Sequence, residues 1–423
     1  MAARLLAFCV SGVTADGRSG PPPVTEVGSS RRFLAAALLL FRPLMRWPRQ
    51  PAELVRFSRF RPPFCPWPEC AAHRAPGRGF QRYGFYRKPS DFRRIPRFRC
   101  RNCKRTCSRQ TFSTTYYLKR PALLVAVASG LAACSAHRQI ARSCHCAKTS
   151  VTRMAERLGR HAILFHARCR ASLPTWIETI VHDHWEVFIG RQDRALGIGT
   201  AVGAESWFVY DIDPAPHRGS GRRPDRKKDR EAAAWPSASY VESIKRTFRG
   251  LIPHLSENQS LVCNVDGRTD YPVAVRDDDL RSRVVLRIYP NPVRGPKGTP
   301  RSPEAVERDR AMFPVDQLHQ LLRHTCADHK RETIAFGRRL ESVLGRAHLM
   351  AVWKNFIKSR SERAPDRTTP AMRLGMTETR WRFERVLSRR LFPEREPVSE
   401  SARTIYRKRW TRGLPVLDLK HAA

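Results

Sequence analysis

The spacing of hydrophobic residues along this chain divides its first part into three segments. Residues 1–61 follow neither the helical nor the strand period, so we expect a poorly ordered extension rich in arginine and proline. Residues 62–118 hold few aliphatic side chains but many Cys, Arg, Pro and aromatic residues. Such a segment cannot build a hydrophobic core alone and is expected to need a metal ion to fold. Residues 119–172 take up helical spacing.

Strand alternation mixed with helical segments follows, and it predicts an α/β domain over residues 173–360. The expected strands lie in the runs IVHDHWEVFIG, ALGIGTAV and SWFVYDI, and at Leu261–Val265 and Val284–Tyr289. The expected helices lie near Tyr240–Leu251, near Tyr271 and, with a break around Asp328, over Pro314–Ile357. Polar loops are expected at 214–234 and 290–303, and residues 361–423 form a basic C-terminal tail.

The charge of the chain changes this picture from a fold to a function class. Lys and Arg number 79 against 38 Asp and Glu, a formal net charge of +41. A polyanionic partner is the economical explanation. A membrane is disfavoured, because the longest apolar run, Phe33–Phe41, is about half of what spans a bilayer. The N-terminal residues also lack a convincing signal-peptide cleavage site.

Two pairs of cysteines predict a structural zinc site. Cys65 and Cys70 form one pair, and Cys100 and Cys103 form the second, so four thiolates could enclose one tetrahedral Zn²⁺. Four protein ligands close the site to substrate, which excludes a catalytic role for this ion. Further possible ligands are His73 and Cys107, and the alternative is a set of unrelated buried thiols. Metal-type clustering of cysteines favours a reducing compartment.

Residues 138–158 resemble a helix-turn-helix in their pattern. A short helix around Ile140 is followed by a turn at Ser143–Cys146, and Thr149 is expected to cap a second helix reaching Leu158. One face of that helix is apolar and the other is basic. The residues expected to contact DNA are Arg138, Thr149, Arg153, Arg157 and Arg160. An ordinary amphipathic helix with a solvated basic face is the alternative.

An aspartate inside an apolar strand needs a functional reason, because burying an unpaired charge costs several kcal/mol. Asp183 lies in such a strand. Since side chains alternate along a strand, His182, His184 and Glu186 should point away from the face of Asp183.

Two further aspartates stand where an active site would need them. Asp266 directly follows the strand LVCNV, and Asp316 lies in the first turn of the helix expected after Pro314. Together with Asp183 they could hold Mg²⁺ or Mn²⁺, and a pair of such ions activates an attacking oxygen and stabilises a leaving one. Taken alone, a choice of three acids from so many is a weak signal.

The chain resembles bacterial insertion-sequence transposases that carry a zinc ribbon, a helix-turn-helix and a DDE catalytic domain of ribonuclease H-like fold. The resemblance covers about residues 62–415. Its motifs are CPWPEC, FRCRNCKRTCSRQTFSTTYYLKRP, RQIAR, VHDHWEVF, GTAVGAESWFVYDIDPAP, VDGRTDYP, DQLHQLLRHTCADHKRETIAFGRRL, VWKNFIKSRSER and TTPAMRLGM.

This resemblance implies cleavage at element ends by water and joining of the freed 3′-hydroxyl to target DNA, by at least a dimer in the bacterial cytoplasm. It matches Asp183, Asp266 and Asp316 to the three catalytic acids. Many members carry Glu at the third position, for which Glu332 and Glu341 are the fallbacks. The other functions to weigh are a DNA-binding protein that has lost the chemistry and a nuclease that cuts without joining.

Overall fold

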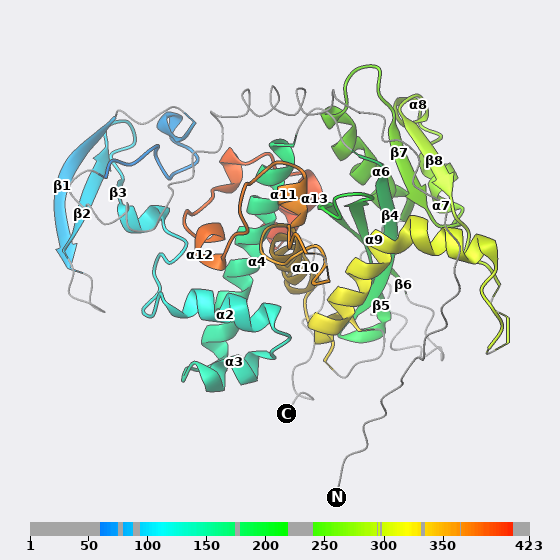
Figure 1. Ribbon diagram of the computed structural model, residues 1–423. Coiled ribbons are helices and arrows are strands. Elements are labelled where there is room, and N and C mark those ends of the chain that lie inside the picture. Colours follow the sequence, from blue (N-terminus) through cyan, green and yellow to red (C-terminus); the bar gives the residue numbers. More distant parts are fainter. Residues whose placement is uncertain are drawn as a thin grey trace, which may run out of the picture. The chain divides into compact units, whose positions relative to one another are not determined.

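The computed structural model describes most of the chain between Phe60 and Lys408 (Figure 1). The described ranges are 60–74, 79–87, 94–173, 178–218, 240–293, 295–296, 298–330, 335–363 and 365–408. The expected N-terminal extension lies outside these ranges except for Phe60 and Arg61. No helix in the described ranges is both long enough and apolar enough to cross a bilayer.

The cysteine-rich segment forms a small antiparallel sheet in the order β1-β2-β3. Its elements are η2 Ala71–His73, β1 Phe80–Arg87, β2 Arg94–Cys100, β3 Thr106–Ser108 and η3 Arg109–Phe112. Phe64, Phe98, Cys107 and Phe112 make an aromatic cluster beside it, which Phe392 from the far end of the chain completes. The Phe64 and Phe392 rings meet edge to face with 5.1 Å between centroids.

Three helices follow: α2 Leu123–Ala132, α3 His137–Ser143 and α4 Lys148–Ala171. The expected turn is present between α3 and α4, but α4 continues well past the predicted end at Leu158. Its N-cap is Ala147, so Thr149 lies inside the first turn and does not cap the helix. In its second half α4 packs against α10 Leu340–Phe356. A Cβ on Gly159 would lie 2.9 Å from the Gly345 Cα, so the two backbones approach too closely for any larger residue.

The second sheet has five strands in the order β6-β5-β4-β7-β8 (Figure 1). They are β4 Ile180–Ile189, β5 Arg191–Gly203, β6 Val209–Arg218, β7 Leu261–Val265 and β8 Val284–Ile288. Strands β4, β5 and β6 pair antiparallel, whereas β7 runs parallel to both β4 and β8. The sheet is therefore mixed and its domain is α/β, as the sequence predicts.

Helices cover both faces of this sheet. The remaining elements of the region are α6 Tyr240–Leu251, η4 Ile252–His254, α7 Asp270–Ala274, α8 Asp278–Arg281, α9 Pro303–Thr325 and η5 Ala327–His329. On one face, His184 Nε2 lies 3.2 Å from the Ser243 hydroxyl of α6. On the other, the Trp185 ring lies 4.9 Å from the His319 ring of α9. The His184 side chain therefore packs on the face opposite to that of Trp185, as the alternation predicts, although His184 also lines the pocket of Asp183 described below.

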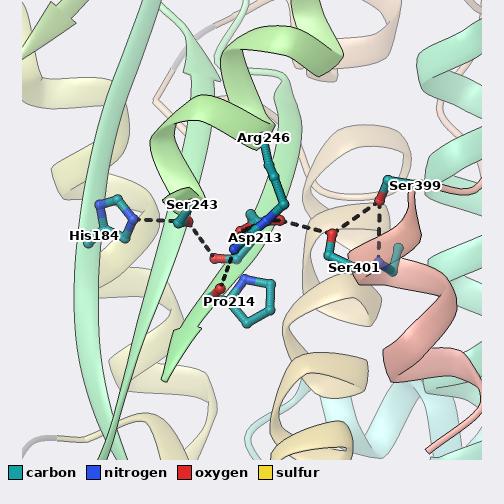
Figure 2. Close-up of polar contacts among 8 residues, drawn as sticks. His184, Asp213, Pro214, Ser243, Arg246, Ser399 and Ser401 are labelled. Atoms are coloured by element: carbon teal, nitrogen blue, oxygen red, sulfur yellow. Dashed lines mark hydrogen bonds and ion pairs between the residues drawn. The ribbon is translucent and has the colours of Figure 1, made fainter. Parts of the chain in front are cut away.

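The described residues between 361 and 408 are folded, which corrects the prediction of a basic tail for this part, while 409–423 lie outside the described residues. The folded part contains α11 Pro370–Arg373, α12 Phe383–Val386, η6 Pro393–Arg395 and α13 Glu400–Tyr406. Figure 2 shows how α13 joins the sheet: the Ser401 hydroxyl donates to Asp213 at 2.9 Å, and Arg246 of α6 pairs with the same carboxylate at 2.6 Å. The high net charge hid a set of apolar residues that are buried here, namely Trp381, Phe383, Leu391, Phe392, Val398 and Ile405.

Two other predicted boundaries are wrong. Strand β6 runs to Arg218, so the first residues of the expected loop at 214–234 belong to the sheet, and 219–234 lie outside the described residues. Helix α9 begins at Pro303, where the Ser302 hydroxyl accepts the Ala305 amide as an N-cap. Pro314 lies inside α9, and Asp316 therefore stands in the middle of a long helix and not in its first turn.

Candidate zinc centre and carboxylate pocket

The four predicted cysteines converge on one point. Their sulfurs all lie within 4.8 Å of one another. The Cys65 and Cys103 sulfurs are 3.6 Å apart, and those of Cys70 and Cys100 are 3.9 Å apart. Sulfurs placed about 2.3 Å from a tetrahedral zinc ion would be about 3.8 Å apart. The spacing therefore fits a metal ion such as zinc.

Local backbone hydrogen bonds build both cysteine turns. The Cys70 amide donates to the Trp67 carbonyl at 3.1 Å, and the Lys104 amide donates to the Cys100 carbonyl at 3.0 Å. Lys104 has a φ of 60°, which turns the chain sharply after Cys103. Burial, followed by the neighbouring sulfurs, raises the pKa of the Cys65 thiol. Metal binding would therefore release protons from this site.

The two possible additional ligands have other roles. Cys107 belongs to the aromatic cluster with Phe64 and is not part of the four-sulfur group. His73 Nδ1 lies 2.7 Å from the Cys65 carbonyl oxygen, and its ring meets the Phe64 ring edge to face. Neither residue belongs to the four-sulfur group.

The residues predicted to contact DNA do not share one face. Arg138, Thr149 and Arg153 are exposed, as a contact with DNA requires. Arg157 is half-buried: its guanidinium donates to the carbonyls of Thr114 and Tyr116 at 2.8 and 2.7 Å and covers the Tyr116 ring at 4.2 Å. The expectation that Arg157 lies on the exposed basic face is wrong.

Arg160 is also set apart from that exposed face. It lines a pocket between α4 and α10 whose rim includes Ile405 and Lys408 from the C-terminal segment. Two basic residues that the prediction omitted, Arg142 on α3 and Lys148 at the start of α4, are exposed near Thr149. The N-terminal end of a second helix is the part that enters a DNA groove, and that rule could have identified both residues.

Asp183 and Asp266 stand side by side because of strand register. In the parallel pair β4 and β7, His182 is opposite Val265. The next residue along each strand is an aspartate, and residues at the same level of neighbouring parallel strands point to the same face. Asp266 lies just beyond the end of β7, where its carboxylate accepts the Arg268 amide at 3.2 Å.

Asp316 comes to the same pocket from the helix above the sheet. Helix α9 packs against β4, β5 and β7. The Asp316 carboxylate is paired with the Arg308 guanidinium, two turns earlier on the helix. On the next turn, His319 places Nδ1 3.6 Å from an Asp183 carboxylate oxygen and Nε2 2.8 Å from the Thr200 hydroxyl. Sequence reasoning missed His319, although its spacing from Asp316 places it on the same side of α9.

The three aspartates line an open, polar pocket of about 330 Å³. Its lining residues are Asp183, His184, Asp266, Arg268, Asn291, Arg308, Asp316, His319, Gln320 and Arg323. Burial raises the pKa of Asp183 to about 7, with further contributions from the Asp266 and Asp316 charges. Burial also raises the pKa of Asp266. Burial thus disfavours the charged form of both carboxylates, an effect that a bound cation would offset.

The carboxylates are more widely spaced than the sulfurs. Within the described ranges, sets of three or more metal-binding atoms lying within 4.8 Å of one another comprise the four cysteines and a group of Cys326, Asp328 and His329. The three aspartates do not form such a set, and Asp316 is already ion-paired with Arg308. Their oxygen donors suit Mg²⁺ or Mn²⁺ by type.

Neither glutamate fallback joins this pocket in the described structure. Glu341 lies on α10 and lines the separate pocket between α4 and α10. Glu332 lies outside the described residues. Asp316 is consequently the third acid that the described residues offer beside Asp183 and Asp266.

Comparison of this chain with models of protein families, with curated proteins and with solved structures finds no match.

Proposed function

We propose that this protein is a transposase of the DDE type, which binds the ends of a mobile element and catalyses metal-dependent cleavage and strand transfer of DNA. The observation that carries the proposal is the arrival of Asp183, Asp266 and Asp316 in one polar pocket from a strand, a strand end and a helix. The motif resemblance supplies the reaction type.

The sheet supports a ribonuclease H-like fold for this domain. Three antiparallel strands are followed by two parallel ones on the other side of the first strand, with helices on both faces. In that arrangement the first strand lies at the centre and the fourth lies beside it. Two acids on those neighbouring strands and a third on a later helix agree with the order that the resemblance implies.

The pocket residues suggest how the chain would assist the reaction. Asp183 and Asp266, with Asp316, would hold Mg²⁺ or Mn²⁺, which supplies an activated oxygen nucleophile and stabilises the leaving oxygen. Arg268 and Arg323 line the same pocket and would attract the DNA phosphate. For Asp316 to bind an ion, its contact with Arg308 would have to open, which frees that guanidinium for phosphate as well.

The cysteine-rich sheet and helices α3 and α4 would bind the DNA. The zinc-bound sheet and the exposed residues Arg138, Thr149 and Arg153 would contact the terminal repeats, with Arg142 and Lys148 added from the structure. Two DNA ends must be joined to one target, so a homo-oligomer on DNA belongs to the proposal.

A plasmid-nicking assay tests the chemistry. The protein is incubated with supercoiled plasmid in Mg²⁺ or Mn²⁺, and relaxed and linear products are measured. We expect cleavage that chelation stops and that Asp183→Ala and Asp266→Ala each abolish while duplex binding persists. Retained cleavage by either variant would remove that residue from the mechanism.

A second candidate function is that of a DNA-binding protein whose chemistry has been lost. The ion pair between Asp316 and Arg308 favours it, because that carboxylate is already neutralised. Asp316→Ala separates the two functions: an active enzyme loses cleavage, whereas a DNA-binding protein without chemistry shows no metal-dependent cleavage before or after the change. Products joined to a second DNA would separate a transposase from a simple nuclease.

A further inference from the structure

A strained turn beside the carboxylate pocket presents a tryptophan. Trp207 lies between β5 and β6 with a φ of 63°, a conformation that bulky residues rarely adopt. The buried carboxylate of Glu178 holds the turn by accepting the Glu205 and Ser206 amides at 2.6 and 2.7 Å. A Cβ at Gly203 would overlap that carboxylate. The fold thus keeps a costly conformation at Trp207, as happens where a side chain has a functional role.

Trp207 forms a pair with an exposed aromatic residue of α9. The Phe313 ring centroid is 5.2 Å from that of Trp207, and Phe313 remains 47% exposed. Phe313 precedes Asp316 by three residues, so it lies on the same side of α9 and about 4.5 Å further along the axis. The aromatic pair therefore lies about one helical turn from Asp316 of the carboxylate pocket.

Two cationic side chains lie beside the Trp207 ring. The Arg360 guanidinium lies 4.3 Å from the Trp207 ring centroid, and Lys354 Nζ lies 5.6 Å from it. Lys354 is 3% exposed and donates to Gln317 at 2.6 Å, but among the described residues no carboxylate lies within ion-pair distance of it. Burial, and then Lys358 and Arg360, lowers the pKa of Lys354 to about 7. Arg360 therefore supplies the accessible positive charge beside the Trp207 ring, whereas Lys354 is buried beneath it.

We propose that Trp207, Phe313 and Arg360 form a binding site for one unpaired nucleotide of the DNA strand that enters the carboxylate pocket. The base stacks on the exposed Phe313 ring beside Trp207, and its phosphate meets Arg360. This inference rests on the proposed DNA reaction and adds that the strand is locally unpaired there. A half-exposed aromatic ring close to an arginine guanidinium matches a base joined to a phosphate.

Photochemical coupling tests the position of the base. A short single-stranded oligonucleotide carrying 5-iodouracil, which couples on irradiation to aromatic rings stacked on it, is bound to the full chain and the products are mapped by mass spectrometry. We expect coupling in the tryptic peptides that contain Phe313 or Trp207. Coupling confined to aromatic residues elsewhere, such as Tyr83 and Phe85 of β1, would overturn the inference without touching the proposed enzyme.

Substitution of the exposed ring provides the second test. Phe313→Leu should weaken binding of short oligodeoxythymidine by roughly 5- to 150-fold, the equivalent of one lost base stack, and leave duplex binding within about twofold. Phe313→Tyr, which keeps an aromatic ring, should retain the wild-type affinity for the oligonucleotide. Val306→Ala, which trims another exposed apolar residue of α9, is the matched control.

The outcomes separate the two proposals. If Phe313→Leu behaves like Val306→Ala on both DNA forms, the nucleotide site is overturned while the enzyme proposal stands. If the wild-type chain binds neither form, the DNA-processing function fails and this inference with it. Loss of single-strand affinity in Phe313→Leu, together with coupling at its peptide, supports the site.

Discussion

The cysteine site and the carboxylate pocket were both predicted as metal sites, but they differ in how complete they are. Four sulfurs already lie at distances that suit a tetrahedral ion. The three aspartates only surround a pocket, and one of them is paired with Arg308. Each pair of cysteines sits in its own tight turn, whereas every aspartate comes from a different element.

The two sites differ in how strongly their ligand groups repel one another when no ion is bound. Neutral thiols do not repel one another, and burial favours the neutral form of Cys65 by raising the pKa of its thiol. Carboxylates repel each other near neutral pH, so they stay apart, take up a proton or bind a cationic side chain. A closed site suits a structural ion and an open one suits substrate.

Removal of the zinc-binding capacity should have the largest effect. Cys100→Ser is expected to destabilise the β1–β3 region by about 10 kcal/mol, the order of a structural zinc ion, and to abolish zinc retention. Amide hydrogen exchange should speed up in β1–β3, while the β4–β8 sheet keeps its protection. The matched control is Cys144→Ser in the turn before α4, which should keep its zinc. Full zinc content in Cys100→Ser would refute the ligand assignment.

Loss of a pocket carboxylate should act on activity in place of folding. Asp266→Ala is expected to lower cleavage by at least about a thousandfold, or roughly 4 kcal/mol of transition-state stabilisation, without loss of zinc. Plasmid nicking and zinc analysis of the same preparation measure both effects. Asp278→Ala, at an exposed position of helix α8, serves as control and should retain activity. Equal activity of the two variants would remove Asp266 from the site.

The carboxylate pocket should also destabilise the protein in a pH-dependent way. Burial raises the pKa of Asp183 from 3.8 to about 7, so the folded chain holds a proton that the unfolded chain releases. Protonated Asp183 therefore contributes its full stability below about pH 4, and this contribution is lost as the pH rises through about 7. Asp183→Asn should make the metal-free protein more stable above pH 7, on the order of 3–4 kcal/mol, and change little near pH 4.

Thermal unfolding of the wild type and Asp183→Asn across this pH range, in chelator, measures that difference. Addition of Mg²⁺ or Mn²⁺ should stabilise the wild type far more than the variant, because only the former offers a carboxylate at this position. If the stability of the two proteins depends on pH in the same way, the pKa of Asp183 is not raised in the folded chain.

The smallest effects should distinguish two arginines of α4. Arg153→Gln should lower duplex affinity by about 1 kcal/mol and reduce the salt dependence by about one phosphate contact, with stability unchanged. Arg157→Gln should instead lower stability by about 1–3 kcal/mol, because the Thr114 and Tyr116 carbonyls lose their donor. Salt-titrated anisotropy and thermal unfolding check both, and a reversed outcome would restore Arg157 to the DNA face.

The sequence by itself determined the features that depend on local spacing. The paired cysteines, the alternation that separates Asp183 from His184, and the position of Asp266 at the end of an apolar strand all follow from residues close together in the chain. Such patterns survive folding because strand pleat and tight turns act over only a few residues.

Tertiary structure decided what depends on contacts between distant residues. Helical spacing placed Arg157 on a basic face, but only packing of α4 against the segment at Thr114–Tyr116 turned its guanidinium inward. Likewise Phe392 completes the aromatic cluster of the cysteine-rich segment, and Arg308 forms an ion pair with Asp316. A residue's type and spacing say which interactions it can make, but burial and competition among partners, which are set by the whole fold, decide which one it makes.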